Sequence, residues 1–260
     1  MIKFVKLHGL GNDFLVSFTA GGPALARVAC DRHSGIGADG LILGRRTAAG
    51  DLSFQLWNAD GSEAEMSGNG MRCLAHAALD DGLAEENQPL AVMTSVGPRS
   101  VTIRRTGPGE TWAVVDMGPV KVRSDAAGLC NVGHGAVLVD VGNPHLVVLG
   151  PDPATVDVGR LGPELERSDP AGLNVEFVTL GPEPDSITMR VWERGVGETQ
   201  ACGTGSCAAA AALHHWGRVG RSVTVRQPGG AVAVDLRPDG TTTLAGPSVR
   251  IASCEWERPA

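Results

Sequence analysis

Two stretches of this 260-residue chain decide its fold, WNADGSEAEMSGNG at residues 57–70 and WERGVGETQACGTG at residues 192–205. A shift of 135 residues aligns them and places Ser67 over Cys202. Outside these stretches, further pairs keep the same order: Gly-Asn at 11–12 and 142–143, turns at Gly97 and Gly229, and Gly-Pro at 118–119 and 246–247. Such collinear self-similarity indicates two related halves joined near residue 118.

The predicted elements agree between the halves. Short or alternating apolar runs bounded by Gly, Pro and Asp predict strands, at 2–7, 13–18, 52–57, 91–94, 100–105 and 111–116, then at 135–141, 145–149, 174–179, 186–192, 222–226 and 231–236. A helix is predicted directly after each Gly-x-Gly, at 70–81 and 205–217, and another at 23–33. The expected fold class is therefore α+β, with two similar strand-dominated domains facing each other and one central helix in each.

Composition narrows the classes of partner and compartment. The hydrophobic fraction of 42% supplies a core, and the net charge of -7 offers no basic face for nucleic acid. The N-terminal stretch has no secretory pattern, and nowhere do 18 apolar residues run together, so we expect a cytoplasmic protein without a membrane span. Six cysteines in 260 residues are too sparse for a disulfide scaffold.

The sequence lacks the motifs that are typical of several cofactor-dependent, metal-dependent and hydrolytic enzymes. The three lysines, Lys3, Lys6 and Lys121, are not in settings that suggest a pyridoxal-phosphate Schiff base. The patterns GxxxxGK[ST], HExxH, CxxC and GxSxG are absent, and the GxGxxG at 35–40 precedes an apolar run, so it predicts a turn before a strand. We therefore expect neither a cofactor nor a metal ion.

The doubled Gly-x-Gly motif suggests an anion site. A helix N-terminus presents unpaired N–H groups and partial positive charge, which hold a carboxylate. Ser67 and Cys202 precede the two predicted helices, and we expect the N–H groups to bring the pKa of the Cys202 thiol down towards neutral. Two acid/base groups on opposite faces of a small carboxylate can invert a stereocentre, while the N–H groups stabilise the enediolate.

The motifs together resemble those of one family. They are HGLGNDF at 8–14, GIGADGLIL at 35–43, NADGSEAEMSGNGMRC at 58–73, GNPH at 142–145, GLNVEF at 172–177 and ERGVGETQACGTGSC at 193–207. In this order they resemble diaminopimelate epimerase over nearly the whole chain. The resemblance implies cofactor-independent interconversion of LL- and meso-diaminopimelate in lysine and cell-wall synthesis, by a homodimer.

The resemblance also implies domains and an active site. Two pseudo-twofold-related domains, 1–117 with a returning segment 248–260 and 118–247, would each form a mostly antiparallel curved sheet or barrel around a central helix, with the active site in the cleft between them. Cys202 is similar to one of the two catalytic cysteines. Residues similar to substrate contacts are Asn12, Asn58, Gly68, Asn69, Asn143, Asn174, Glu193, Arg194, Gly203 and Thr204, with Arg194 pairing a distal carboxylate; His145 and Glu193 are placed to influence the thiol pKa values.

One position departs from the family pattern. The family has CGNG where this chain has Ser67-Gly68-Asn69-Gly70, so the second catalytic thiol is an alcohol. Cys73 lies inside the predicted helix, nearly two turns from its start, and cannot replace it. We interpret Cys73, Cys30, Cys130, Cys207 and Cys254 as packed thiols. Either the serine was introduced to trap substrate, or it is native and the chain catalyses slow or one-sided exchange or serves another amino acid.

Two alternative functions stay open at this point. One is a racemase of another amino acid, such as histidine, on the same scaffold; Arg194 and the asparagines argue against it because they provide for a second charged end of the substrate. The other is a non-catalytic amino-acid binder that keeps the cleft without its second base. In each case the partner is a small amino acid.

Overall fold

The computed structural model describes residues 1–64, 66–126 and 134–257. The chain forms two compact units, one of Met1–Val115 with Gly246–Ala260 and one of Asp116–Ala245. It passes from the first unit to the second along strand β8 (Glu110–Pro119) and returns along β17 (Thr241–Trp256).

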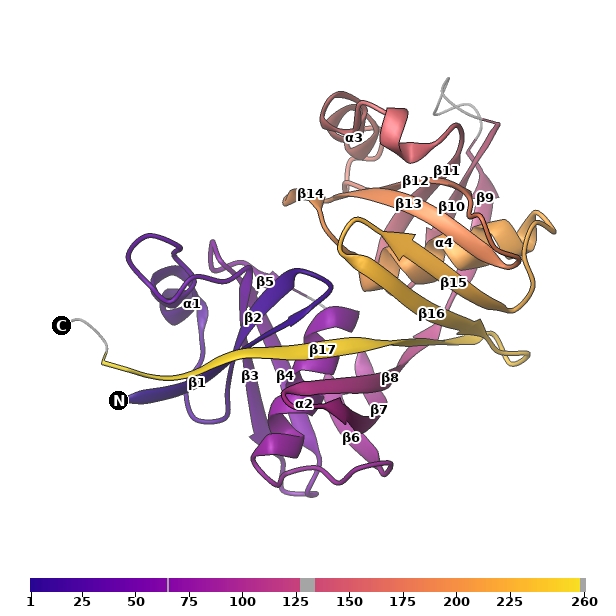
Figure 1. The fold of residues 1–260 in the computed structure, drawn as a ribbon. Coiled ribbons are helices and arrows are strands. Elements are labelled where there is room, and N and C mark those ends of the chain that lie inside the picture. Colours follow the sequence, from indigo (N-terminus) through magenta and orange to yellow (C-terminus); the bar gives the residue numbers. More distant parts are fainter. Residues whose placement is uncertain (65, 127–133, 258–260) are drawn as a thin grey trace. The chain divides into compact units, whose positions relative to one another are not determined.

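The first unit alternates strands with two helices (Figure 1). Besides β8 and part of β17, its elements are β1 (Ile2–Gly9), β2 (Asn12–Ser17), α1 (Pro23–Ala29), β3 (Gly40–Arg46), β4 (Leu52–Asn58), β5 (Glu63–Ala64), α2 (Gly68–Asp80), β6 (Pro89–Thr94) and β7 (Gly97–Gly107).

The second unit repeats this order. Its elements are β9 (Lys121–Asp125), β10 (Gly135–Asp140), β11 (Pro144–Leu149), the short 3-10 helix η2 (Pro153–Thr155), α3 (Val158–Glu166), β12 (Asn174–Leu180), β13 (Ser186–Glu193), β14 (Gly197–Thr199), α4 (Gly203–His215), β15 (Ser222–Gln227), β16 (Gly230–Leu236) and the start of β17.

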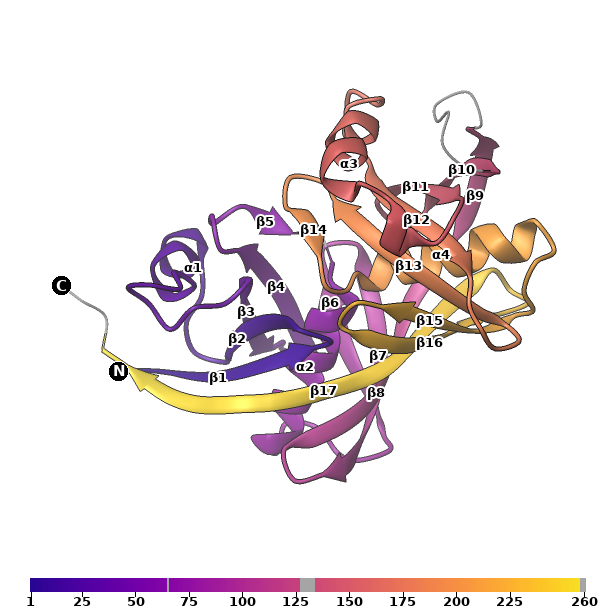
Figure 2. The same ribbon diagram turned by 45° about the horizontal axis from the view of Figure 1, so that its top comes forward.

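Strand pairing is duplicated together with the order of the elements. In the first unit β1 pairs antiparallel with β2, β2 parallel with β3, β3 antiparallel with β4, and β4 parallel with β6. The pairs β10–β11, β11–β12, β12–β13 and β13–β15 have the same directions in the second unit. In the first unit, β6–β7, β7–β8, β8–β17 and β17–β1 then close the sheet into a barrel (Figure 2). The α+β class and the internal duplication are confirmed.

A buried helix occupies the middle of each unit. Helix α2 contacts β1–β4 and β7, whereas α4 contacts β9–β13, β15 and β16. Every residue of α2 from Gly68 to Leu79 is buried, as is every residue of α4 from Gly203 to Leu213. A helix buried on all sides needs small and apolar residues around its whole circumference. The run of five alanines in α4 meets that need.

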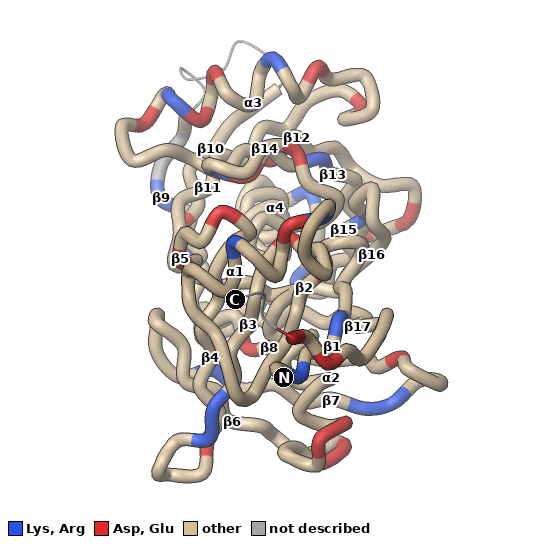
Figure 3. The backbone as a smooth tube through the Cα atoms, turned by 90° about the vertical axis from the view of Figure 1, so that its left-hand side faces the viewer, with Lys and Arg blue, Asp and Glu red and all other residues tan. Residues whose placement is uncertain are grey.

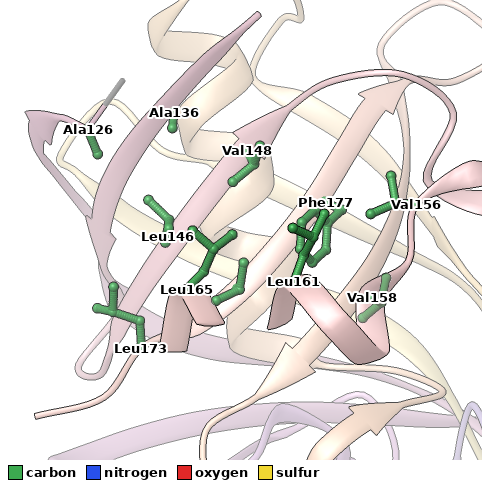
Figure 4. Packing of buried hydrophobic residues seen from close by; sticks show 11 residues of the cluster. Ala126, Ala136, Leu146, Val148, Val156, Val158, Leu161, Leu165, Leu173 and Phe177 are labelled. Atoms are coloured by element: carbon green, nitrogen blue, oxygen red, sulfur yellow. The ribbon is translucent and has the colours of Figure 1, made fainter. Parts of the chain in front are cut away.

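A second helix covers the outer face of each sheet. In the second unit α3 packs Leu161 and Leu165 against Leu146, Val175 and Phe177 of the strands (Figure 4). In the first unit, residues of α1 form a similar cluster with residues of β1–β4. Because successive strand residues point to opposite faces, the residues between those of the clusters point towards the central helix.

Some predicted boundaries are wrong. The central helices begin at Gly68 and Gly203, two residues before the predicted starts, because the residues at 67 and 202 already cap them. Helix α1 ends at Ala29, well short of residue 33. Helix α3 was not predicted: two glycines and Pro163 obscure its pattern, and packing of its apolar face on the sheet stabilises it instead.

Charge is distributed over both units. Figure 3 shows Lys and Arg interspersed with Asp and Glu along the backbone. In the part of the chain that the structure describes, no helix is long and apolar enough to cross a membrane.

Candidate active site

The candidate site of the first unit is the N-terminus of α2. Ser67 is the N-cap, with φ -139° and ψ 119°, and its Oγ accepts a hydrogen bond from the Gly70 N–H at 3.0 Å. Ser67 is half-buried, while Gly68 and Asn69 are buried. An N-cap hydroxyl that satisfies an orphan N–H is a common way to start a helix. The Ser67 hydroxyl therefore lies at the mouth of the helix, beside its first amides.

Predicted binding residues of the first unit gather at this mouth. The Asn69 Nδ2 donates to Asn12 Oδ1 at 3.1 Å, and the Asn12 Nδ2 donates to Asp39 Oδ2 at 2.8 Å. Asn58 ends β4, and its Nδ2 donates to Ser62 Oγ at 3.0 Å. The structure thus links Asn12 directly to Asn69, whereas Asn58 stands in a separate hydrogen bond.

The candidate site of the second unit is the N-terminus of α4, which is built in the same way. Cys202 is the N-cap, with φ -124° and ψ 121°, and its Sγ accepts from the Gly205 N–H at 3.4 Å. The thiol also lies 3.5 Å from Thr204 Oγ1. Cys202 is only 5% exposed. The two caps share backbone geometry and bonding pattern, but not the capping atom.

A buried ring of hydrogen bonds holds the backbone of Cys202. Its N–H donates to Gln227 Oε1 at 2.7 Å, and the Gln227 Nε2 donates to Ser206 Oγ at 3.0 Å. The Ser206 Oγ in turn donates to the Cys202 carbonyl at 2.7 Å. Both polar groups of the Cys202 peptide are therefore engaged, which restricts movement of the thiol.

A buried imidazole and carboxylate lie under the same helix. His145 Nδ1 is 2.7 Å from Glu176 Oε1, and His145 Nε2 is 2.9 Å from Asn143 Oδ1. Neither His145 nor Glu176 is exposed. A Cβ at Gly205 would lie 2.7 Å from Glu176 Oε1, so glycine is needed for the helix to approach this carboxylate. The predicted residues Asn143 and His145 thus contact each other directly, and Glu176 holds the other ring nitrogen of His145.

The expectation that the Cys202 pKa falls towards neutral is wrong. Burial raises the pKa of the Cys202 thiol well above its ordinary value, and the carboxylates of Glu193 and Glu176 raise it further. The hydrogen bonds from Thr204 and the Gly205 N–H lower it, but they do not compensate. Desolvation and nearby negative charge both disfavour a thiolate, so Cys202 is a thiol at neutral pH.

Glu193 lies beside Cys202 at the end of β13. Desolvation of its carboxyl group raises its pKa, although the residue as a whole is only half-buried, while hydrogen bonds with Thr199 and Cys202 lower it. Glu176 raises the Glu193 pKa and His145 lowers it, both as weaker effects. Thus Glu193 acts on the thiol pKa directly, and His145 acts on the pKa of Glu193.

Two further predicted residues lie together next to Glu193. The Arg194 N–H donates to Asn174 Oδ1 at 3.1 Å, and the Asn174 Nδ2 donates to the Pro144 carbonyl at 3.0 Å. The Arg194 Nη1 donates to the Ala171 carbonyl at 3.2 Å. In the second unit the predicted residues therefore form one continuous group from Asn143 to Arg194.

The sequence that forms these two helix N-termini, one of which carries a thiol, matches a known family. The family model described as diaminopimelate epimerase covers residues 4–123 and 137–251. The chain belongs to the diaminopimelate epimerase family. A diaminopimelate epimerase of Desulforudis audaxviator is 40% identical over 280 residues, covering 99% of this chain and all of that protein. One of Desulfitobacterium hafniense is 38% identical over 274 residues, covering 96% of each chain.

Solved structures share the fold of this diaminopimelate epimerase family member at low sequence identity. A structure described as a predicted epimerase from Pseudomonas aeruginosa is 16% identical, with a TM-score of 0.79 and full coverage of both chains. A hydroxyproline epimerase from Agrobacterium vitis is 18% identical, with a TM-score of 0.72, and the match covers 97% of this chain and 91% of that one. These likenesses concern the fold alone.

Sequence reasoning missed four polar residues of this epimerase-family site. Glu176 and Arg72 are completely buried, and each is a charged residue within an otherwise apolar stretch, which was a usable signal. Gln227 and Asp39 carry no such signal, because each stands at a turn where polar residues are common. Their partners are 25 to 27 residues away in sequence.

The remaining thiols of this family member are not among the residues named in the hydrogen bonds above. Cys30, Cys73 and Cys207 are buried, as predicted, whereas Cys254 is half-buried at the exposed end of β17, so that prediction is wrong. Cys130 lies outside the described residues. Among the residues that are described, no group of three or more His, Cys, Asp or Glu side chains is arranged to hold a metal ion.

Proposed function

We propose that this protein binds diaminopimelate and interconverts its LL and meso forms without a cofactor, with positions 67 and 202 as the two acid/base groups. The observation that carries the proposal is the matched pair of caps, in which Ser67 Oγ and Cys202 Sγ each accept the N–H of the residue three positions on. The diaminopimelate epimerases at 38–40% identity support it. Both caps act on one substrate molecule in this proposal.

Helix amides supply the binding site for the α-carboxylate. The N–H groups of Gly68 and Asn69 begin α2, and those of Gly203 and Thr204 begin α4. Such groups favour an anion, and they favour an enediolate more, since its oxygens carry more charge than those of the carboxylate. The proposal therefore needs no electron sink other than these amides.

The protonation state of Cys202 determines which proton transfer it can perform. One group removes the α-proton, the electron pair of the C–H bond moves into the carboxylate to form the enediolate, and the other group delivers a proton to the opposite face of the carbon. A buried thiol with a raised pKa is in the right form to deliver that proton. The opposite direction of the reaction requires the Cys202 thiolate.

The alcohol at position 67 impairs this cycle. A serine hydroxyl is a far weaker acid than a thiol. It therefore needs an adjacent base to remove its proton before it can take the α-proton from the substrate. Strand register aligns Phe14 with His145 and Ile42 with Glu176, so the helix at Ser67 has apolar side chains where the helix at Cys202 has an imidazole and a carboxylate. We infer that the chain as it stands binds substrate but turns it over slowly.

The remaining predicted residues are proposed to bind the second charged end and the other polar groups of the substrate. Arg194 is the cation proposed to pair with the distal carboxylate, because a guanidinium binds a carboxylate with two parallel hydrogen bonds. Asn12, Asn58, Asn143 and Asn174 are proposed to bind the other polar groups, with Glu193 near the α-amino group. A homodimer in the cytoplasm completes the proposal and rests on the family resemblance.

A second candidate is a non-catalytic amino-acid binder. Phe14 and Ile42 favour it, because these apolar residues stand where the second unit has His145 and Glu176. A racemase of a different amino acid, such as histidine, is a further outcome that the same experiment detects.

Deuterium exchange separates these functions. The chain as it is, a Ser67→Cys variant and a Ser67→Ala control are incubated with LL- and with meso-diaminopimelate in deuterated water, and α-carbon exchange and stereochemical conversion are followed. Restoring a thiol should raise conversion by a factor of about 10² or more, the usual contribution of a positioned acid/base group. Cys202→Ser in the Ser67→Cys background should abolish conversion.

The outcomes that contradict the proposal are distinct. Conversion of another amino acid by Ser67→Cys, without conversion of diaminopimelate, overturns the substrate. Binding without any turnover in Ser67→Cys supports the non-catalytic binder. Rapid epimerisation by the unmodified chain shows that the hydroxyl is a competent base.

A further inference from the structure

Four side chains of the first unit form a hydrogen-bonded relay, which we call the Arg72–Asp39 relay. The Arg72 Nη2 donates to Asn69 Oδ1 at 2.7 Å, and the Asn69 Nδ2 donates to Asn12 Oδ1 at 3.1 Å. The Asn12 Nδ2 then donates to Asp39 Oδ2 at 2.8 Å. Two carboxamides, both predicted to contact substrate, thus lie between a guanidinium and a carboxylate.

The charged ends determine the direction of every bond in the relay. A guanidinium can only donate and an ionised carboxylate can only accept, whereas a carboxamide does both. Arg72 therefore requires the oxygen of Asn69 to face it, which turns the Asn69 NH₂ towards Asn12. Asp39 requires the NH₂ of Asn12, which turns the Asn12 oxygen back towards Asn69. Both ends impose the same orientation.

Each end of the relay is itself held. The Asp39 Oδ2 also accepts from the Asp13 N–H at 3.0 Å, and its Oδ1 pairs with Arg32 at 2.7 Å. Arg72 is completely buried, and its Nε donates to the Pro247 carbonyl of β17 at 3.2 Å. These contacts leave neither charged group able to turn away and release the amide that it faces.

We propose that Asp39 and Arg72 are positioning residues that fix the orientation of the Asn12 and Asn69 carboxamides at the mouth of α2. The inference rests on the proposed function, because it assigns these amides to substrate binding. Fixed amide groups bind better than groups that must be ordered when the ligand arrives. Asp39 and Arg72 would therefore govern substrate affinity through the amides, without a contact of their own.

An isosteric change at one end tests the inference. In Asp39→Asn, one oxygen must serve three donors, from Arg32, Asp13 and Asn12, because the new NH₂ cannot accept. If the Asn12 amide turns to offer its oxygen to position 39, its NH₂ faces the NH₂ of Asn69. The Asn69 amide cannot turn in response, because Arg72 donates to its oxygen. The variant therefore no longer fixes the orientation of the Asn12 amide, and water takes up the donor that is left over because the Asp39 side chain is partly exposed.

Calorimetric titration of the unmodified chain with meso-diaminopimelate provides the first measurement. Asp39→Asn should weaken binding by about tenfold or more, as expected when a polar group loses its partner. Asp81→Asn, which removes one exposed carboxylate at the other end of α2, is the matched control and should bind like the parent. Parent-like affinity in Asp39→Asn overturns the inference.

Side-chain amide NMR provides a second measurement that needs no substrate. The Asn69 Nδ2 resonances should shift in Asp39→Asn because Asn12 links the two residues in the relay, while those of Asn58 should stay in place. The double variant Asp39→Asn/Asn12→Asp puts an acceptor at position 12 for both neighbours, so it should restore the Asn69 resonances but not the affinity. The affinity stays low because the Asn12 amide itself is gone, so in this variant the resonances alone report on the relay.

The two measurements separate the two proposals. If the parent does not bind diaminopimelate, the proposed substrate is wrong, and the Asn69 resonances still judge the relay. If the parent binds and the Asn69 resonances do not move in Asp39→Asn, the relay is wrong. Should Asp39→Asn fail to fold, the double variant gives the decision, because Asn69 resonances that stay displaced although position 12 again carries an acceptor contradict the relay.

Discussion

The N-termini of α2 and α4 have the same backbone and different chemistry. Ser67 and Cys202 adopt nearly the same φ and ψ angles, and each accepts the N–H of the residue three positions later. Below the first cap lies Ile42, and in the equivalent position below the second lies Glu176. The comparison shows that helix geometry places a reactive atom, whereas side chains from neighbouring strands set its acidity.

The largest effect is expected when both caps carry the same atom. In Ser67→Cys, the thiol at position 67 should react with iodoacetamide about a hundredfold faster than Cys202, because no carboxylate stands at the positions equivalent to Glu193 and Glu176, and because the site is more exposed. Mass-spectrometric peptide mapping over time measures both rates, with half-buried Cys254 as an internal reference. Equal rates would mean that the helix amides, and not the strands, govern acidity.

A smaller effect is expected from the ring that holds Cys202. Gln227→Ala should lower the free energy of unfolding by about 1–3 kcal/mol, because it leaves the buried Cys202 N–H without its acceptor. Urea unfolding measures the change, and Gln55→Ala, at an exposed position of β4, is the matched control. A change no larger than that of the control would show that water replaces the lost acceptor.

The smallest effect concerns one carboxylate. Glu193→Gln should speed alkylation of Cys202 by about tenfold at fixed alkaline pH, equivalent to about one unit of pKa. The sign follows from the raised pKa, since removal of a negative charge stabilises the thiolate and so lowers the thiol pKa towards its ordinary value. Glu164→Gln, on the outer helix, should leave the rate unchanged. A slower reaction in Glu193→Gln would indicate that Glu193 accepts the thiol proton.

Local sequence was enough for the duplicated frame of the molecule. The repeat of 57–70 at 192–205 predicted both central helices, and the apolar runs predicted most of the strands around them. Local sequence patterns suffice there, because the N-cap residue and the small and apolar residues that follow it directly are enough to predict a buried helix. These local patterns did not predict helix α3, because packing against the sheet beneath it stabilises this helix.

The amino-acid sequence by itself determined the family and the two capping positions, Ser67 and Cys202. Only the tertiary structure decided the protonation state of Cys202 and the orientation of the Asn12 and Asn69 amides. The first property depends on Glu176 and the second on Asp39, and both residues are brought to the caps from positions distant in the sequence. Electrostatic effects depend on distance and burial, and neither can be read from separation along the chain.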